Sequence, residues 1–168
     1  MRKLPCIALL AISGAALATP LAVDHRVAMT PIVIAPSLQA KLQQEYGAAE
    51  GLILQGDVSH QLSRVLAACG TNTASIEVAI EDAAPTHPTR KQIADHPSVD
   101  ALRSVYLGGA RLSATLRGAD GAVLTRVAHS YYPDTLKRAS ASGYAWADAR
   151  LAIGQFADKL AEVCHRLP

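Results

Sequence analysis

Alternating apolar and polar side chains in residues 103–132 form the clearest structural pattern in this chain of 168 residues. Segments 103–117 and 122–132 flank Asp120-Gly121, a dipeptide that favours a two-residue type I′ turn between antiparallel strands. That turn pairs mostly apolar side chains on one face: Ala110 with Tyr131, Leu112 with His129, Ala114 with Val127 and Leu116 with Thr125. The other face pairs Arg111 with Ser130, Ser113 with Ala128, Thr115 with Arg126 and Arg117 with Leu124. Because a shift of one residue would mix the two faces, the sequence predicts this hairpin in this register.

Two further strands are predicted upstream of the hairpin. In residues 74–83, Ile and Val alternate with more polar positions, which is typical of a sheet with one solvated face. Residues 26–34 are rich in Val and Ile but include Pro31, which cannot donate a ladder hydrogen bond, so this strand is expected to be bent or at a sheet edge. Residues 84–101 contain several prolines and fit no period, so they are predicted to be a loop.

Helical spacing predicts three helices. The first covers residues 36–46 and ends at Gly47. The second covers residues 49–69, ends at Gly70, and is expected to bury one apolar face: Leu52, Ile53, Val58, Leu62, Val65, Leu66 and Cys69. The last follows a loop rich in Ser and Ala and is expected to bury another stripe: Trp146, Ala149, Ile153, Phe156, Leu160 and Val163.

The order of these elements is strand, helix, helix, strand, strand, strand, helix. It predicts an α+β fold, a two-layer sandwich in which helices cover one face of a mostly antiparallel sheet of about four strands. We expect residues 19–168 to form a single domain of this kind, a length that suits one core.

The first eighteen residues have the features of a secretory signal peptide. Arg2 and Lys3 precede an apolar run over residues 4–17, and Ala16-Leu17-Ala18 supplies the small residues that a signal peptidase needs. The run is shorter than the roughly 20 apolar residues of a membrane-spanning helix. We therefore expect residues 1–18 to be removed, and the mature protein to be exported to the periplasm without a transmembrane segment.

Charge and cysteine content narrow the possible partners. The net charge of +2 comes from Arg2 and Lys3, so residues 19–168 are formally neutral. Nucleic-acid binding requires a basic footprint, which this neutral chain lacks.

Cys6 falls within the signal and is not placed for lipid attachment at a cleavage site, so no lipid anchor is expected. Cys69 and Cys164 are predicted to form one disulfide in an oxidising compartment; the alternative is two buried free thiols.

Several enzymatic chemistries find no support in the sequence. No serine has the G-x-S-x-G context of an α/β-hydrolase nucleophile. Glu77 and Glu81 lie on one side of one strand, about 13 Å apart, which exceeds the separation in glycosidase pairs. We expect both to meet arginines of neighbouring strands: Arg111, Arg117 or Arg126. His87, Asp95 and His96 have irregular spacing, so no metal site, cofactor or catalytic residue is assigned.

Two sets of residues are candidates for binding. The first is the long segment 84–101, whose polar groups could form a recognition surface: Thr86, His87, Thr89, Arg90, Lys91 and Gln92. A plain connecting loop is the alternative. The second is the pair His129 and Tyr131, which the hairpin register turns toward the apolar face, where they could line a small pocket beneath the last helix. Here the alternative is that His129 is a residue at the edge of the core with a satisfied ring nitrogen.

Residues 45–163 contain four distinctive runs: IEDAAPTHPTRKQ, LGGARLSATLRGADGAVLTRV, YY and W-A-D-A-R…F-A-D-K-L. In these runs the chain resembles uncharacterised families of small exported proteins and lipoproteins of Gram-negative bacteria. The resemblance implies an exported location and a fold but transfers no catalytic residue, and this chain lacks the lipid-modified cysteine of the lipoprotein members.

Together these observations favour a non-enzymatic periplasmic protein that binds a protein or cell-envelope component. The alternative is a module that binds a small ligand or a metal ion.

Overall fold

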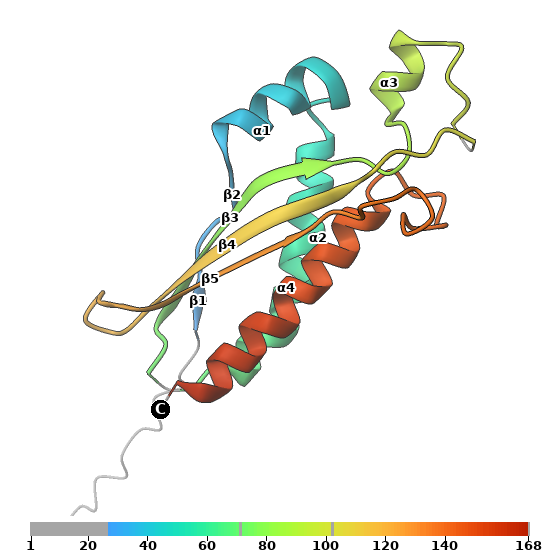
Figure 1. Ribbon diagram of the computed structural model, residues 1–168. Helices are drawn as coiled ribbons and strands as arrows, with labels where there is room; N and C mark the ends of the chain where they lie inside the picture. Colours follow the sequence, from blue (N-terminus) through green and yellow to red (C-terminus); the bar gives the residue numbers. More distant parts are fainter. Residues whose placement is uncertain (1–26, 71, 102, 168) are drawn as a thin grey trace, which may run out of the picture.

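The computed structural model describes residues 27–70, 72–101 and 103–167 and has an α+β fold, as the sequence predicts (Figure 1). The predicted signal peptide lies outside these residues. In chain order the elements are β1 (Ala28–Met29), β2 (Val33–Ile34), α1 (Pro36–Lys41), the π-helical segment η1 (Leu42–Tyr46), α2 (Glu50–Val65), the 3-10 turn η2 (Leu66–Ala68), β3 (Ser75–Ala84), α3 (Arg90–Asp95), β4 (Gly109–Arg117), β5 (Val123–Tyr131) and α4 (Ala147–Arg166). Within the described ranges, none of the helices is long and apolar enough to cross a membrane.

The sheet has the order β1-β3-β4-β5, and β2 also pairs with β3. Strands β3, β4 and β5 are antiparallel, whereas β1 and β2 run parallel to β3 at its outer edge. These two short strands are the halves of the predicted first strand, which is interrupted around Pro31. The prediction of an edge strand disturbed by proline is therefore confirmed, and the interruption accounts for five strands in place of about four.

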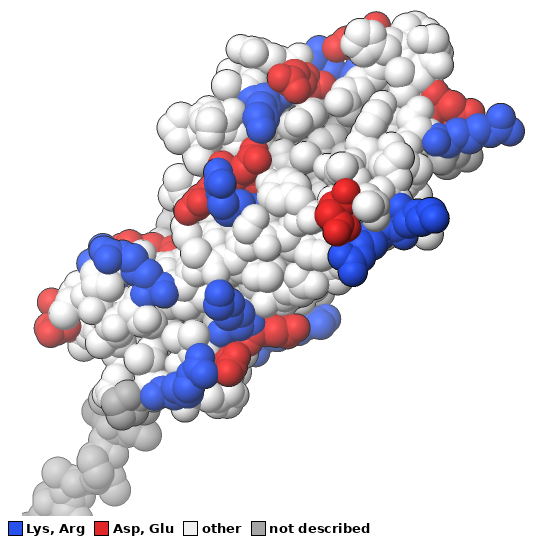
Figure 2. Space-filling model, in the orientation of Figure 1, with Lys and Arg blue, Asp and Glu red and all other residues white. Residues whose placement is uncertain are grey.

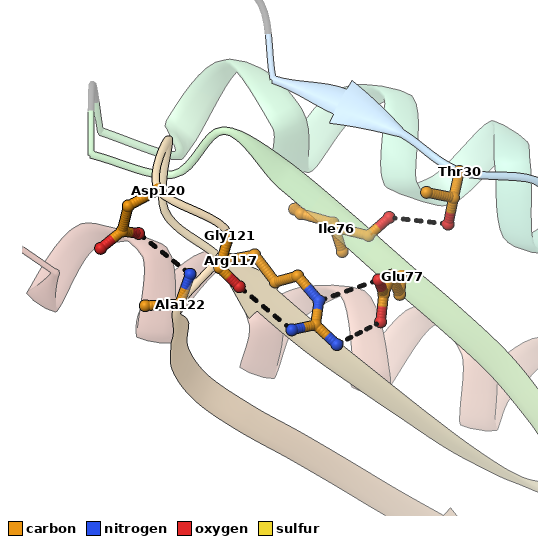
Figure 3. Close-up of polar contacts among 7 residues, drawn as sticks. All are labelled: Thr30, Ile76, Glu77, Arg117, Asp120, Gly121 and Ala122. Carbon is orange, nitrogen blue, oxygen red and sulfur yellow. Dashed lines mark hydrogen bonds and ion pairs between the residues drawn. The ribbon is translucent and has the colours of Figure 1, made fainter.

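The pairing of β4 with β5 follows the predicted register from Ala110–Tyr131 to Leu116–Thr125. It departs at the turn, where Arg117 pairs with Val123 rather than Leu124 because the register shifts after Leu116. The Arg117 guanidinium donates to Glu77 on β3 and to the carbonyl of Gly121 in the turn (Figure 3).

The hairpin turn is longer than the predicted type I′ turn. The Gly118 amide donates to Ala122 O and the Gly121 amide to Gly118 O, both at 3.0 Å. A type I′ turn needs positive φ at both central residues, but among the described residues only glycines have positive φ, and here it is Gly121, at 79°. The geometry is that of a three-residue loop ending in a left-handed glycine. Asp120 Oδ1 accepts from the Ala122 amide at 2.9 Å, which stabilises the loop (Figure 3).

Helices α2 and α4 pack side by side on one face of the sheet, and the core lies between the two layers (Figure 1). The apolar residues of β3, β4 and α4 that alternation and helical spacing select are buried, apart from the half-buried Val163. The prediction for α2 is partly wrong, because Leu54 is fully buried while Leu52 and Ile53 are 73% and 42% exposed. The buried line of α2 runs through Leu54 and Val58 and continues at spacings of four and three, which leaves the two preceding apolar residues on its outer side.

The opposite face of the sheet carries paired charges. Arg117 Nε lies 2.9 Å from Glu77 Oε1, and Arg111 Nε lies 3.0 Å from Glu81 Oε2. The expectation that the two glutamates meet arginines of the neighbouring strand is therefore confirmed. Figure 2 shows acidic and basic side chains in small mixed groups on the visible face, separated by uncharged surface.

The predicted disulfide is present and joins the C-terminal ends of α2 and α4. Cys69 follows η2, Cys164 lies in the last turn of α4, and their Cα atoms are 4.5 Å apart. At the other end of the same helix pair, Trp146 contacts Glu50. The two helices therefore run parallel, connected at both ends.

Reduction of the disulfide should strongly destabilise the fold. The bond closes a loop with a sequence separation of 95 residues, and constraining the unfolded chain to this extent stabilises the native state by about 4–5 kcal/mol in the chain-entropy model. Urea denaturation of the mature protein with and without reductant measures the loss. A Cys69→Ala/Cys164→Ala double variant is the control and should match the reduced protein and not respond to reductant. A loss below about 1 kcal/mol would contradict this account.

Candidate functional site

The segment predicted as a loop, residues 84–101, contains the helix α3 and is buried in its first part. Thr86, His87 and Thr89 are buried, so these three candidate residues do not form an exposed recognition surface. The helix begins with a capping box: Thr89 Oγ1 accepts from the Gln92 amide at 3.3 Å, and Gln92 Oε1 accepts from the Thr89 amide at 3.0 Å. The spacing T-x-x-Q at residues 89–92 was the sequence signal for this helix.

Thr86 anchors the segment to the start of α4. Its hydroxyl donates to Asp148 Oδ2 at 2.9 Å and accepts from the Asp148 amide at 3.0 Å. Asp148 is fully buried, and its Oδ1 accepts from the Ser140 amide at 2.9 Å. The Thr86 amide also donates to Ala145 O at 2.6 Å. A buried carboxylate with donors on both oxygens holds two distant parts of the chain together.

Gly108 is required by this anchor. A Cβ atom at this position would overlap Thr86 Oγ1 and the Thr86 backbone. Gly108, directly before β4, therefore allows a close approach of two backbone segments, and only a residue without a side chain leaves room for it.

His87 is buried in the same segment. Its Nδ1 lies 3.1 Å from Ser104 O, and because a carbonyl only accepts, Nδ1 carries the hydrogen. Its Nε2 is buried and has no hydrogen-bond partner among the described residues. Asp95, which the sequence places eight residues after His87, forms an ion pair with Lys91 (Nζ to Oδ2, 2.6 Å). In the described part of the chain, no group of three or more His, Cys, Asp or Glu residues could hold a metal ion.

A cleft lies where α2, α3 and the start of α4 meet. We call it the α2–α3–α4 cleft; it has a volume of about 210 Å³, and its main lining residues are Glu50, Ile53, Arg90, Ile93, Tyr144 and Trp146. Of the six candidate loop residues, Thr89 and Arg90 contribute to it. The Thr86–Asp148 contact holds the residues that lead into α3 at the start of α4, and the capping box defines where α3 begins.

The floor of the cleft contains a buried carboxylate. Glu50 is 8% exposed, and its Oε2 accepts from Trp146 Nε1 at 2.7 Å. The Trp146 ring is buried, and the Tyr46 ring packs edge-on against it with centroids 5.7 Å apart. No hydrogen bond reaches Glu50 Oε1 within residues 27–70, 72–101 and 103–167. One oxygen of a carboxylate in the cleft lining thus has no protein donor.

Arginines flank the cleft but do not pair with that carboxylate. Arg150 Nε binds Asp57 Oδ2 at 2.8 Å, and its guanidinium lies over the Tyr144 ring, 5.1 Å from the centroid. Arg90 is exposed and forms no ion pair in the part of the chain that the structure describes. Tyr144 is 65% exposed, so the cleft has an aromatic rim.

The second candidate pair, His129 and Tyr131, does not line the α2–α3–α4 cleft. His129 is half-buried opposite Leu112, as the register predicts, and its Nε2 lies 3.0 Å from Gln155 Oε1 on α4. Tyr131 packs against the core and also borders a hollow of about 490 Å³, whose other lining residues are Tyr132, Pro133, Asp134 and Arg138. His129 is not part of that lining.

A cluster around Asp82 joins α1 to the end of β5. Lys41 Nζ lies 2.8 Å from Asp82 Oδ1, and the Tyr132 hydroxyl donates to Asp82 Oδ2 at 3.1 Å. The hydrogen bond to Asp82 raises the pKa of Lys41. Burial, followed by the negative charge of Asp82, raises the pKa of Tyr132.

Comparisons with known proteins find no matching family model, curated protein or solved structure. The site is therefore interpreted from its own geometry.

Removal of the Thr86 hydroxyl should destabilise the protein by about 2–3 kcal/mol, because Thr86→Val leaves a buried carboxylate oxygen without its donor. Urea denaturation measures the change. Thr135→Val, at an exposed position of the 133–145 loop, is the matched control and should change stability by less than about 0.5 kcal/mol. Equal effects of the two variants would show that the Thr86–Asp148 contact does not anchor the segment.

The Asp82 cluster predicts a loss of stability at alkaline pH. Both raised pKa values mean that the folded state holds its protons more tightly than the unfolded state, so this stabilisation is present below about pH 10 and is lost as the pH rises further. Denaturation between about pH 9 and about pH 11 measures the slope. Tyr132→Phe should make the slope of stability against pH shallower, whereas the control Tyr106→Phe, at an exposed position, should not. An unchanged slope in Tyr132→Phe would refute this assignment.

Proposed function

We propose that this protein is an exported, non-enzymatic binding protein that holds a segment of a protein partner in the α2–α3–α4 cleft. The observation that carries the proposal is a preformed cleft with an aromatic rim beside exposed apolar residues. Tyr144 and Ile53 are 65% and 42% exposed, yet Trp146 below them is buried and fixed by Glu50. Tyr, Trp and Arg are the residue types enriched where protein interfaces concentrate their binding energy.

Export is supported by the disulfide and the leader. A disulfide between Cys69 and Cys164 persists in the periplasm or outside the cell, whereas cytosolic reductants keep thiols reduced. The first eighteen residues have the charge, apolar run and small residues of a secretory signal. The resemblance to exported families favours the same location.

The size of the cleft favours a segment of a protein over a free small molecule. Its volume of about 210 Å³ is below the roughly 300–1,000 Å³ of typical small-molecule pockets. A space of this size accommodates one or two side chains of a larger partner, whose remaining contacts would lie on the rim. Asp148 supports a role in structure rather than in catalysis, because it is fully buried and both of its oxygens accept hydrogen bonds.

Replacement of the 84–101 segment would not test binding directly, because it would remove the buried residues Thr86, His87 and Thr89 and with them the Thr86–Asp148 contact. A photoreactive phenylalanine analogue at Tyr144, in cells that express the full chain, tests the cleft instead. The same analogue at Leu136, which is 59% exposed in the same loop, is the control. We expect a covalent protein adduct from position 144 and none of the same composition from position 136.

A matched pair of second-site variants tests whether the adduct depends on the cleft. Ile53→Asp places a charge on the cleft wall and should abolish the adduct. Leu52→Asp, one residue earlier and more exposed, does not alter the lining and should leave the adduct unchanged. An adduct that survives Ile53→Asp, or that forms equally at position 136, would refute the proposal. The absence of any protein adduct would do the same and favour a small ligand in this cleft.

A further inference from the structure

We infer that the α2–α3–α4 cleft recognises a primary ammonium group on an apolar stem, namely a lysine side chain of the partner, and that Glu50 is its acceptor. This inference rests on the proposed function and names the chemistry of the segment that the cleft holds. Its basis is a buried carboxylate in the cleft lining of which only one oxygen has a hydrogen-bond donor among the residues that the structure describes.

Glu50 is largely buried, and its Oε1 keeps some contact with solvent on the cleft side. Removing an ionised carboxylate from water costs several kcal/mol unless a cation or several hydrogen bonds replace the lost hydration. Glu50 receives one neutral donor, the indole N–H of Trp146, at 2.7 Å. Arg150 does not neutralise it, because its guanidinium is committed to Asp57 and to the Tyr144 ring. A cation that enters the cleft would supply the missing charge and donor.

The geometry favours ammonium over guanidinium. Guanidinium binds carboxylates most strongly through two parallel hydrogen bonds, one to each oxygen. At Glu50, the indole N–H of Trp146 uses one of the two lone-pair positions of Oε2, so a bidentate guanidinium would have to share that oxygen, whereas Oε1 accepts from no donor among the described residues. An ammonium group acts as a compact charge and needs a single acceptor oxygen, which matches this arrangement.

The walls of the cleft suit the stem of a lysine. Ile53 and Ile93 provide apolar contacts from α2 and α3, and Tyr144 provides them from the loop before α4. Lysine commonly places its four methylene groups along apolar surface with its charged end at a polar site. The cleft thus combines apolar walls with an anionic group in its lining, and of its two flanking arginines Arg150 is paired with Asp57.

Binding of small probes to the mature, oxidised protein tests the inference. The probes are Nα-acetyl-L-lysine methylamide and its norleucine and arginine counterparts, titrated by two-dimensional amide NMR. We expect the lysine probe to shift cleft residues with a Kd at least tenfold lower than that of norleucine, which lacks the charge, and lower than that of arginine. Equal Kd values for lysine and norleucine, or no saturable shift with lysine, would overturn the inference.

Glu50→Gln provides the decisive variant. Its amide oxygen can still accept from Trp146, so the fold should persist, which the thermal midpoint checks. We expect the tenfold preference for lysine over norleucine to disappear. Glu45→Gln, at an exposed position of η1, is the matched control and should retain it. A preference that persists in a folded Glu50→Gln variant would refute the role of Glu50.

The photo-adduct separates this inference from the function on which it rests. If the adduct from position 144 forms and depends on Ile53, the cleft binds a protein. Mass spectrometry should then locate a lysine within a few residues of the cross-linked partner residue. An adduct without a neighbouring lysine would overturn the ammonium inference while leaving the proposed function intact.

Discussion

The parallel pairing of α2 and α4 is the constraint on which the rest of the structure depends. A hydrogen bond joins Trp146, at the start of α4, to Glu50, at the start of α2. The Arg150–Asp57 ion pair follows about one turn later on α4 and about two turns later on α2, and the Cys69–Cys164 bond closes the far end. Because both helices also bury apolar faces against one sheet, neither can slide or rotate without breaking a contact at one end. The cleft lies at the end of this helix pair that has no covalent bond. At that end, hydrogen bonds and packing maintain the position of α4 relative to α2.

The third wall of the cleft depends on the same helix pair. Thr86 joins the segment that leads into α3 to Asp148, two residues after Trp146. The contact between the two helices and the contact that positions α3 therefore converge on the first turn of α4. A displacement of α4 along its axis would open the cleft and disturb Glu50 and Thr86 together, so folding and the shape of the site are coupled.

The sequence predicted correctly those parts of the fold in which apolar and polar residues repeat with a regular spacing. Period-two alternation was sufficient for the β4–β5 register, because only one alignment separates the apolar from the polar face on both strands. Spacing alone could not select Leu54 from the three consecutive apolar residues of α2, since the sheet decides which one is buried. The short α3 has no periodic pattern, and the contact between Glu50 and Trp146 joins residues 96 positions apart. The cleft therefore became visible only in three dimensions, although the capping box at Thr89 was readable.

Stability alone does not explain a glutamate at position 50. A glutamine would accept the indole N–H of Trp146 equally well and would avoid burying a charge, which costs several kcal/mol even after relaxation. The negative charge gains from the N-terminal dipole of α2, but that effect contributes only about 0.3–1 kcal/mol in typical settings. Contact of Oε1 with solvent lowers that cost, and a cation bound at Oε1 would lower it further. The ammonium inference accounts for this choice of residue, because a carboxylate at position 50 would attract a cation to Oε1 and a glutamine would not.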